Sequence, residues 1–258
     1  MKVLSRKGLP SIAYRDDGAG PPLVLVHGVG AESRSWDEVA ARLGGFRVIR
    51  LDLRGHGRSD PIRGSIRAED FARDVTDVMD ALDVKAARVA GFSLGGAVAL
   101  ALALGAPRRV EKLAVISAVC GRTPEERSRA AERVEFLRKN GLAAIAESNR
   151  ERWFTDAFRA AHSDKVEARV QQLLACDAES YQESFRVFST TDYAERLHEI
   201  HAPALIATGE HDGGSTPRMA RLMHERIAGS KLEILPGLRH GLLVEAPERV
   251  AALLDRFF

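Results

Sequence analysis

Three residues of this chain have the types and surroundings needed for nucleophilic catalysis, and the first is Ser93. It lies in the sequence GFSLG at 91–95, between a short apolar run and a run of small residues typical of a helix. A serine on such a strand-to-helix turn presents its hydroxyl above the sheet, and flanking glycines allow the sharp turn. The competing interpretation is a tight turn without chemistry, because the motif alone is weak.

A nucleophilic serine needs a base, and the base needs an acid to orient it. Asp212 follows a β-type run at 205–208, and His240 follows another at 231–235. Functional groups of parallel sheets gather in the loops after such strands. We therefore predict Ser93 as the nucleophile, His240 as the general base and Asp212 as the orienting acid.

The remaining histidines give no competing site. His27 and His56 lie in predicted loops and are expected to stabilise them, whereas His211 is expected to be incidental. No pair of histidines has the spacing of a metal-binding motif such as HExxH. The sequence therefore predicts neither a metal nor an organic cofactor.

Apolar runs alternate with helical segments along the first half of the chain. The runs lie at 23–27, 46–51, 87–90 and 113–117. Continuous apolar runs are typical of parallel strands buried on both faces. A one-faced helix is predicted over 70–82, and residues 11–15 are expected to form an edge strand. The alternation predicts an α/β fold, a mostly parallel twisted sheet with helices on both faces.

The pattern changes after residue 121. Between 122 and 201 the sequence is charged and helical, without a convincing strand. Helices are expected at 126–139, 142–151, 165–175 and 180–187. We expect a core formed by 1–120 and 202–258, with a helical insertion at 121–201. A protein-interaction face is the second interpretation of the insertion.

Together these motifs resemble the serine hydrolases of the α/β-hydrolase fold that carry a helical cap. The closest pattern is that of 3-oxoadipate enol-lactonase-like enzymes. The resemblance covers nearly the whole chain and includes LVLVHGVG at 23–30, DLRGHGRS at 52–59 and the GFSLG turn. It implies that residues 121–201 cap the pocket and select the substrate, and it favours Asp212 over the neighbouring Glu210 as the acid.

Acyl transfer places negative charge on a carbonyl oxygen, which requires hydrogen-bond donors already in position. The backbone N–H of Leu94, directly after the serine, is expected to be one donor. The resemblance assigns the second to the backbone N–H of Val29, which follows His27 and Gly28. We therefore predict an oxyanion hole formed by Val29 and Leu94.

The insertion contains ERWFT at 151–155, which is similar to a stretch in 3-oxoadipate enol-lactonases. An arginine there would suit a substrate carboxylate. Arg122, Arg133 and Arg152 are therefore candidate substrate contacts, together with Trp153. The competing interpretation for each arginine is a surface ion pair.

Three functions fit these residues. The first is hydrolysis of an ester or lactone of a small carboxylated substrate through an acyl-enzyme. The second is carbon–carbon bond hydrolysis of ring-cleavage dienoates by the same three residues, and a perhydrolase side activity is also compatible. The third, a non-catalytic ligand receptor, is disfavoured by the intact Ser93, Asp212 and His240. The bulky residues at 237–243 differ from the small polar ones of the lactonases, so the substrate stays open.

The composition gives no reason to expect nucleic acid or a membrane as a partner. With 38 basic and 36 acidic residues the net charge is +2, and no basic block suggests nucleic acid. The longest apolar run, 97–104, is too short to span a bilayer, and the first seven residues lack a signal-peptide core. Two cysteines imply no disulfide framework. We expect a cytoplasmic protein without membrane partners; its oligomeric state is not indicated.

Overall fold

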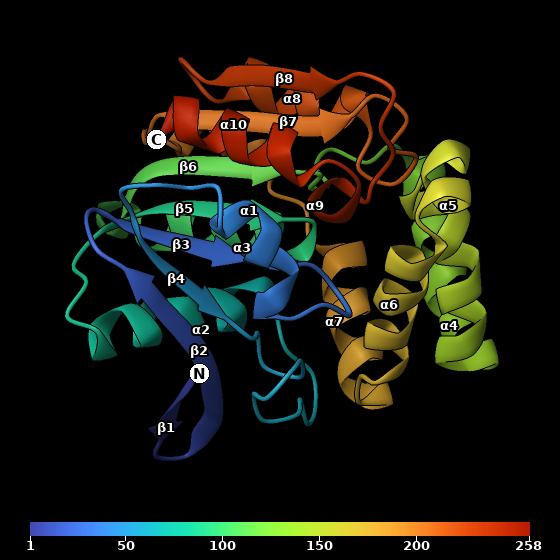
Figure 1. The fold of residues 1–258 in the computed structure, drawn as a ribbon, viewed down its shortest axis with the longest axis horizontal. Coiled ribbons are helices and arrows are strands. Elements are labelled where there is room, and N and C mark those ends of the chain that lie inside the picture. Colours follow the sequence, from blue (N-terminus) through green and yellow to red (C-terminus); the bar gives the residue numbers. More distant parts are fainter.

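The computed structural model describes residues 1–258 and contains one eight-stranded sheet with helices on both faces (Figure 1). The strand order is β1-β2-β4-β3-β5-β6-β7-β8. Strands β3 to β8 are parallel, whereas β2 pairs antiparallel with both β1 and β4. The strands are β1 (Lys2–Arg6), β2 (Leu9–Gly18), β3 (Pro22–Val26), β4 (Arg47–Leu51), β5 (Ala87–Phe92), β6 (Val110–Ile116), β7 (Ala204–Gly209) and β8 (Lys231–Leu235). The mostly parallel α/β fold is thus as predicted.

The central strands are buried on both faces because their side chains alternate between two apolar layers. Val24 and Val26 of β3 pack in the layer of α2, α3 and α8, whereas Leu23 and Leu25 pack in the layer of α1, α9 and α10. These helices are α1 (Asp37–Ala40), α2 (Ala68–Ala81), α3 (Leu94–Gly105), α8 (Pro217–Arg226), α9 (Leu242–Glu245) and α10 (Pro247–Phe257). Short 3-10 helices span Ser33–Trp36, Pro107–Arg109 and Ala194–Glu199. The continuous apolar runs of the sequence follow from this two-sided burial.

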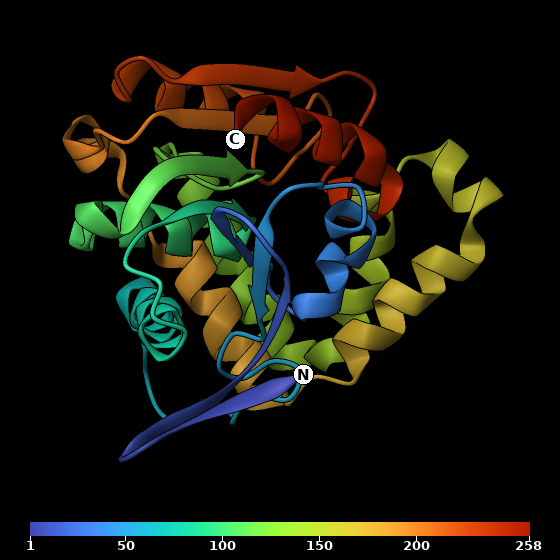
Figure 2. The same cartoon turned by 60° about the vertical axis from the view of Figure 1, so that its left-hand side comes forward.

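The prediction that residues 11–15 form an edge strand is wrong, because this strand has a neighbour on each side in the sheet. These residues lie inside β2, and β1 covers the outer side of β2. The hairpin of β1 and β2 extends away from the rest of the sheet (Figure 2). β1 is mostly exposed and has little apolar sequence, so it lacks the buried-strand pattern that identifies the others.

Four α-helices lie between β6 and β7 in the sequence and gather beside the carboxyl ends of the parallel strands (Figure 1). They are α4 (Pro124–Trp153), α5 (Asp156–Ala161), α6 (Ser163–Leu174) and α7 (Ala178–Thr190). The sequence predicts all of them except the short α5. No helix of the structure has both the length and the apolar character required to cross a membrane.

Helix α4 consists of two helices that fold back on each other at Gly141. This residue has a left-handed φ of 76°, which favours glycine. Arg133 Nη2 donates to Ser148 Oγ at 3.0 Å and to Asn149 Oδ1. Fifteen or sixteen residues of continuous helix would span roughly 24 Å, so these contacts require the chain to reverse. The predicted break between 139 and 142 coincides with this reversal.

The two ends of the helical segment meet at Asp192. Its Oδ1 accepts the backbone N–H of Gly121 at 2.9 Å, and its Oδ2 accepts that of Arg122 at 3.3 Å. Oδ1 also accepts the N–H of Ala194 at 3.0 Å. Since β6 and β7 are neighbours in the sheet, the segment leaves and re-enters the core at one place.

Candidate active site

Ser93 lies at the turn between β5 and α3 and has a strained backbone, with φ 57° and ψ −116°. The turn is tight on both sides. A Cβ on Gly91 would lie 2.0 Å from the carbonyl oxygen of Gly95, and one on Gly95 would lie 2.1 Å from that of Val26. Glycine is therefore required at both flanks, and the turn places Ser93 at the carboxyl end of the sheet.

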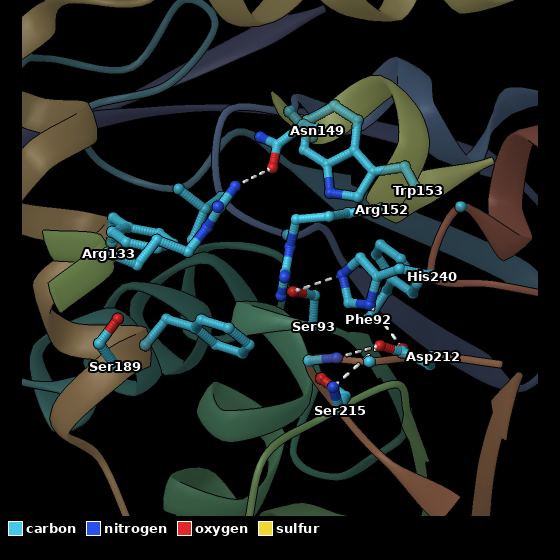
Figure 3. Close-up of a pocket in the computed structure, with 18 of the residues that line it drawn as sticks. Phe92, Ser93, Arg133, Asn149, Arg152, Trp153, Ser189, Asp212, Ser215 and His240 are labelled. Carbon is cyan, nitrogen blue, oxygen red and sulfur yellow. Dashed lines mark hydrogen bonds and ion pairs between the residues drawn. The ribbon is translucent and has the colours of Figure 1, made fainter. Parts of the chain in front are cut away.

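His240 joins Ser93 to Asp212 by hydrogen bonds, as Figure 3 shows. Its Nε2 lies 3.2 Å from Ser93 Oγ, and its Nδ1 lies 2.6 Å from Asp212 Oδ2. An ionised carboxylate can only accept, so Nδ1 carries the proton and the Nε2 of a neutral ring is free to accept one. The structure thus brings together the three residues predicted from separate loops, with geometry suited to proton removal from the serine.

The Asp212 carboxylate is buried in the turn after β7 and is held by several donors. Its Oδ1 accepts the backbone N–H groups of Gly214 and Ser215, each at 2.9 Å. Burial, the largest single influence, opposes ionisation. The His240 ring and the two amides outweigh it and hold the pKa of Asp212 below its usual range. The carboxylate is therefore ionised at neutral pH and fixes the tautomer of His240.

The two residues predicted to supply oxyanion donors are Leu94, directly after Ser93, and Val29, in the loop after β3. Leu94 is the first residue of α3, where backbone N–H groups have no acceptor within the helix. Val29 lies in the loop after β3, next to Gly28, and both line the same cavity as Ser93. The predicted donors thus belong to two different segments, the start of α3 and the loop after β3.

His27 orients the peptide unit that contains the Val29 N–H. Its Nε2 accepts the N–H of Leu53 at 3.0 Å, so Nδ1 carries the proton and donates to the Gly28 carbonyl at 2.8 Å. Burial lowers the pKa of His27 to about 4, which keeps the ring neutral at pH 7. Because the Gly28 carbonyl and the Val29 N–H belong to one peptide, fixing the first fixes the second.

The other histidines that were predicted to be non-catalytic are His56 and His211. His56 is buried and packs edge-on against His27, with ring centroids 5.1 Å apart. Burial lowers the pKa of His56 to about 3. His211 is exposed, and none of these three rings forms a hydrogen bond with Ser93.

A cavity lies between the core and the helical segment, with Ser93 in its floor (Figure 3). Five arginines line it: Arg122, Arg129, Arg133, Arg152 and Arg169. The acidic residues of its lining are Glu126 and Asp212, and Asp212 is already engaged by His240. The surplus of positive charge favours an anionic ligand.

The sequence matches the protein-family model described as alpha/beta hydrolase fold over residues 21–247. This chain belongs to the α/β-hydrolase family. It is 29% identical over 257 residues to 3-oxoadipate enol-lactonase 1 of Acinetobacter baylyi, which covers 99% of this chain and 95% of that protein. A solved hydrolase from Pseudomonas aeruginosa shares 30% identity at a TM-score of 0.92, covering 99% of this chain and 97% of the other. The solved enol-lactonase from Burkholderia xenovorans shares 27% identity at a TM-score of 0.91, covering 99% of each chain.

Within the cavity of this α/β-hydrolase, Arg152 has its donors free. Its side chain extends toward Ser93 (Figure 3), and it forms no hydrogen bond or ion pair with another residue. Arg133 is partly engaged, because it donates to Ser148 and Asn149. Burial, together with the neighbouring charge of Arg152, lowers the pKa of Arg133 to about 10. These two arginines face the cavity without a carboxylate partner.

Arg122 also borders the cavity, but its guanidinium is hydrogen-bonded to the carboxyl end of α7. It donates to the backbone carbonyls of Ser189 at 2.8 Å and Phe188 at 3.3 Å. Burial lowers the pKa of Arg122, although the nearby Asp192 carboxylate opposes this shift. These hydrogen bonds satisfy carbonyls of the last turn of α7, which have no N–H donor within the helix.

Trp153, a predicted substrate contact, lines the cavity, and Arg169 packs over its ring at 4.4 Å from the centroid. Arg169 also donates from Nη1 to the Gly30 carbonyl at 2.7 Å and from Nη2 to the Val29 carbonyl at 3.1 Å. It therefore connects α6 to the loop that carries a predicted oxyanion donor.

Arg169 was not predicted as a site residue because α6 is rich in charged residues. One signal was present: Arg169 lies at helical spacing between Val166 and Leu173, on the apolar side of α6. A charged residue on a buried face requires a polar partner. Asn149, which is buried in α4 among apolar residues, carries the same kind of signal.

Proposed function

We propose that this protein hydrolyses an ester or lactone of a small carboxylated substrate through an acyl-enzyme formed on Ser93. The observation that carries the proposal is the hydrogen-bonded series Ser93–His240–Asp212, which opens into an arginine-rich cavity. Its membership of the α/β-hydrolase family and its similarity to enol-lactonases support the same conclusion.

In the first half-reaction the Ser93 hydroxyl attacks the substrate carbonyl carbon while His240 Nε2 takes its proton. The ionised Asp212 stabilises the imidazolium that forms. The N–H groups of Val29 and Leu94 donate to the carbonyl oxygen as it becomes negative. Collapse of this intermediate breaks the carbon–oxygen bond, and His240 returns its proton to the departing oxygen. In a lactone the departing oxygen stays attached to the acyl group.

In the second half-reaction water takes the place of the serine. His240 Nε2 removes a proton from water, the resulting hydroxide attacks the acyl carbon, and Ser93 leaves with the proton. The product is a carboxylic acid, and its release restores the starting enzyme.

We assign the substrate carboxylate to Arg152, because its donors are free and extend toward Ser93. A guanidinium can bind a carboxylate through two parallel hydrogen bonds. In this proposal residues 121–201 act as a cap, since α4, α6 and α7 supply the wall of the cavity that faces the nucleophile. The cap then determines which acyl group fits.

The nucleophile is tested by Ser93→Ala on p-nitrophenyl acetate, a carboxylated enol-lactone and a coloured dienoate in parallel. We expect wild-type turnover of the ester and the lactone, and a loss of about ten-thousand-fold or more in Ser93→Ala because the nucleophile is absent. Ser35→Ala, which removes another cavity-lining serine, is the matched control and should retain activity. Both variants are checked for an unchanged unfolding midpoint.

Mass spectrometry of rapidly quenched wild-type protein should show the acyl adduct on Ser93. Activity in Ser93→Ala would remove Ser93 from the mechanism. Consumption of the dienoate in place of the lactone would identify a carbon–carbon hydrolase. Binding without turnover of any substrate would identify a receptor.

A further inference from the structure

Arg169 binds the backbone of the oxyanion loop, although it lines the same cavity as Arg152. We propose that Arg169 is a positioning residue that holds the carbonyls of Val29 and Gly30, and thereby fixes the Val29 N–H for the oxyanion. The proposal rests on the function proposed above. It assigns to the cap a part in assembling the oxyanion hole, in addition to its part in shaping the cavity.

The loop has three consecutive carbonyls, and each is held by a side chain. His27 donates to the Gly28 carbonyl at 2.8 Å, and Arg169 donates to those of Val29 and Gly30 at 3.1 and 2.7 Å. The Val29 N–H itself has no acceptor within the protein. The two peptide planes that meet at Val29 are therefore fixed, while the Val29 N–H, which belongs to the first of them, is left for a ligand.

This loop needs external support because glycines flank Val29. Gly30 has a φ of 65°, and a Cβ there would lie 2.6 Å from the ring of Tyr181. Glycines lower the cost of alternative backbone conformations. An oxyanion donor is effective only when it is oriented before the charge develops, so the loop must be held in one conformation.

The guanidinium is suited to this task in two ways. Its planar fork reaches two adjacent carbonyls, and its face packs on Trp153 at 4.4 Å. Arg169 has no ion-pair partner, and burial lowers its pKa to about 10, so it is still charged at neutral pH. Placing a charge here without a carboxylate costs free energy, which indicates that its bonds to the loop matter.

The geometry also couples the cap to the core. Arg169 comes from α6, whereas Val29 and Gly30 belong to the loop after β3. Arg169 therefore supports the Val29 and Gly30 carbonyls only when α6 is seated against this loop. Displacement of α6 would leave the Val29 peptide held by His27 alone, even with Ser93, His240 and Asp212 intact.

The test compares Arg169→Met and Arg169→Lys with Arg186→Met as a matched control. Arg186 also extends from the cap to a core carbonyl, that of Ile66 at 2.6 Å, but it lies outside the cavity. With the neutral ester p-nitrophenyl acetate, we expect kcat of Arg169→Met to fall about 100-fold with little change in KM, because the Val29 N–H is no longer held in position for the oxyanion. Arg169→Lys should recover part of kcat, and Arg186→Met should resemble wild type.

A second readout isolates the oxyanion itself. Phenylboronic acid adds to a serine hydroxyl and places a boronate oxygen where the oxyanion would lie. Its dissociation constant should rise in Arg169→Met by about the same factor as kcat/KM falls. Guanidinium ion added to Arg169→Ala should restore part of kcat.

Two results would overturn the proposal. If Arg169→Met raises KM only for carboxylated esters and leaves the neutral ester unaffected, Arg169 binds substrate. If Arg169→Met lowers kcat without weakening phenylboronic acid binding, or only together with a lower unfolding midpoint, its role is structural.

The same assays separate this proposal from the function on which it rests. Activity in Ser93→Ala would refute the proposed function. A fully inactive Ser93→Ala beside a fully active Arg169→Met would refute only the role of Arg169.

Discussion

Asp212 and Arg152 differ in how their charges are compensated before any ligand binds. The Asp212 carboxylate accepts hydrogen bonds from His240, Gly214 and Ser215, which hold its pKa below the usual range. The Arg152 guanidinium has no protein partner and faces the cavity (Figure 3). The first charge therefore orients His240, whereas the second is available to a ligand.

Replacing Arg152 with glutamine should affect charged and neutral substrates differently. We expect KM for a carboxylated ester to rise about 10- to 100-fold, because a charge-assisted hydrogen bond is lost, and KM for a matched neutral ester to change little. Steady-state kinetics on the pair of esters checks this. Arg150→Gln, whose side chain pairs with Glu147 and Glu167, is the control and should leave both esters unaffected. An equal effect of Arg152→Gln on both esters would contradict the assignment.

Ser93, Asp212 and His240 could be predicted from the sequence because each follows an apolar strand, so their meeting place follows from the sheet alone. Arg169 could not be predicted in the same way. Its partners are backbone carbonyls of a loop far away in the sequence, and no side-chain pattern marks a carbonyl as needing a donor.

Helix α3 packs so closely against β3 and β5 that its first turn depends on glycine. A Cβ on Gly95 would lie 2.1 Å from the Val26 carbonyl oxygen and 2.7 Å from that of His27. The close approach lets β5 turn directly into α3 and holds Ser93 in its strained conformation. The close packing of α3 and the strained backbone of Ser93 are therefore two aspects of the same turn.

We expect Gly95→Ala to lower the free energy of unfolding by several kcal/mol, because either α3 or β3 must move to admit the methyl group. Gly105→Ala, at the other end of α3, is the control. A Cβ there meets nothing within 4 Å, so this change should be neutral or stabilise by up to about 1 kcal/mol. Urea denaturation measures both, and equal stabilities of the two variants would contradict the packing argument.

Elements were predictable where burial imposes a pattern. The parallel strands and the helices of the cap follow from apolar runs and helical periodicity, and the reversal at Gly141 fits the predicted break. Among the elements that were not predicted, α8 and α10 each bury one face, whereas β1 is largely exposed and α5 has no buried residue. Exposed elements leave little trace in the hydrophobic pattern.

At the scale of the whole molecule, two neutral histidines are enclosed in the core beside the active site. Burial lowers the pKa of His27 to about 4 and that of His56 to about 3. In the unfolded chain both would titrate near pH 6.5. Below that pH the unfolded state therefore binds more protons than the folded state, which favours unfolding.

The free energy of unfolding should accordingly fall as the pH drops from about 6.5 toward 4, by up to about 1.4 kcal/mol per pH unit for each histidine. Urea denaturation across this range measures the slope. His56→Gln should flatten it, whereas His211→Gln, which changes an exposed residue, should not. A stability independent of pH between about 6.5 and 4.5 would show that these rings are not held neutral.

The hydrogen bonds from Asp192 to both ends of the helical segment have a consequence for how such proteins can diversify. Because both ends of the helical segment are tied at one junction between β6 and β7, the segment can be replaced as a module without rethreading the sheet. A graft from another hydrolase would inherit the nucleophile and its proton relay unchanged. Under the role proposed for Arg169, the graft would also need a side chain that donates to the Val29 and Gly30 carbonyls. Arg169 is thus the one residue of the segment that could not be exchanged freely.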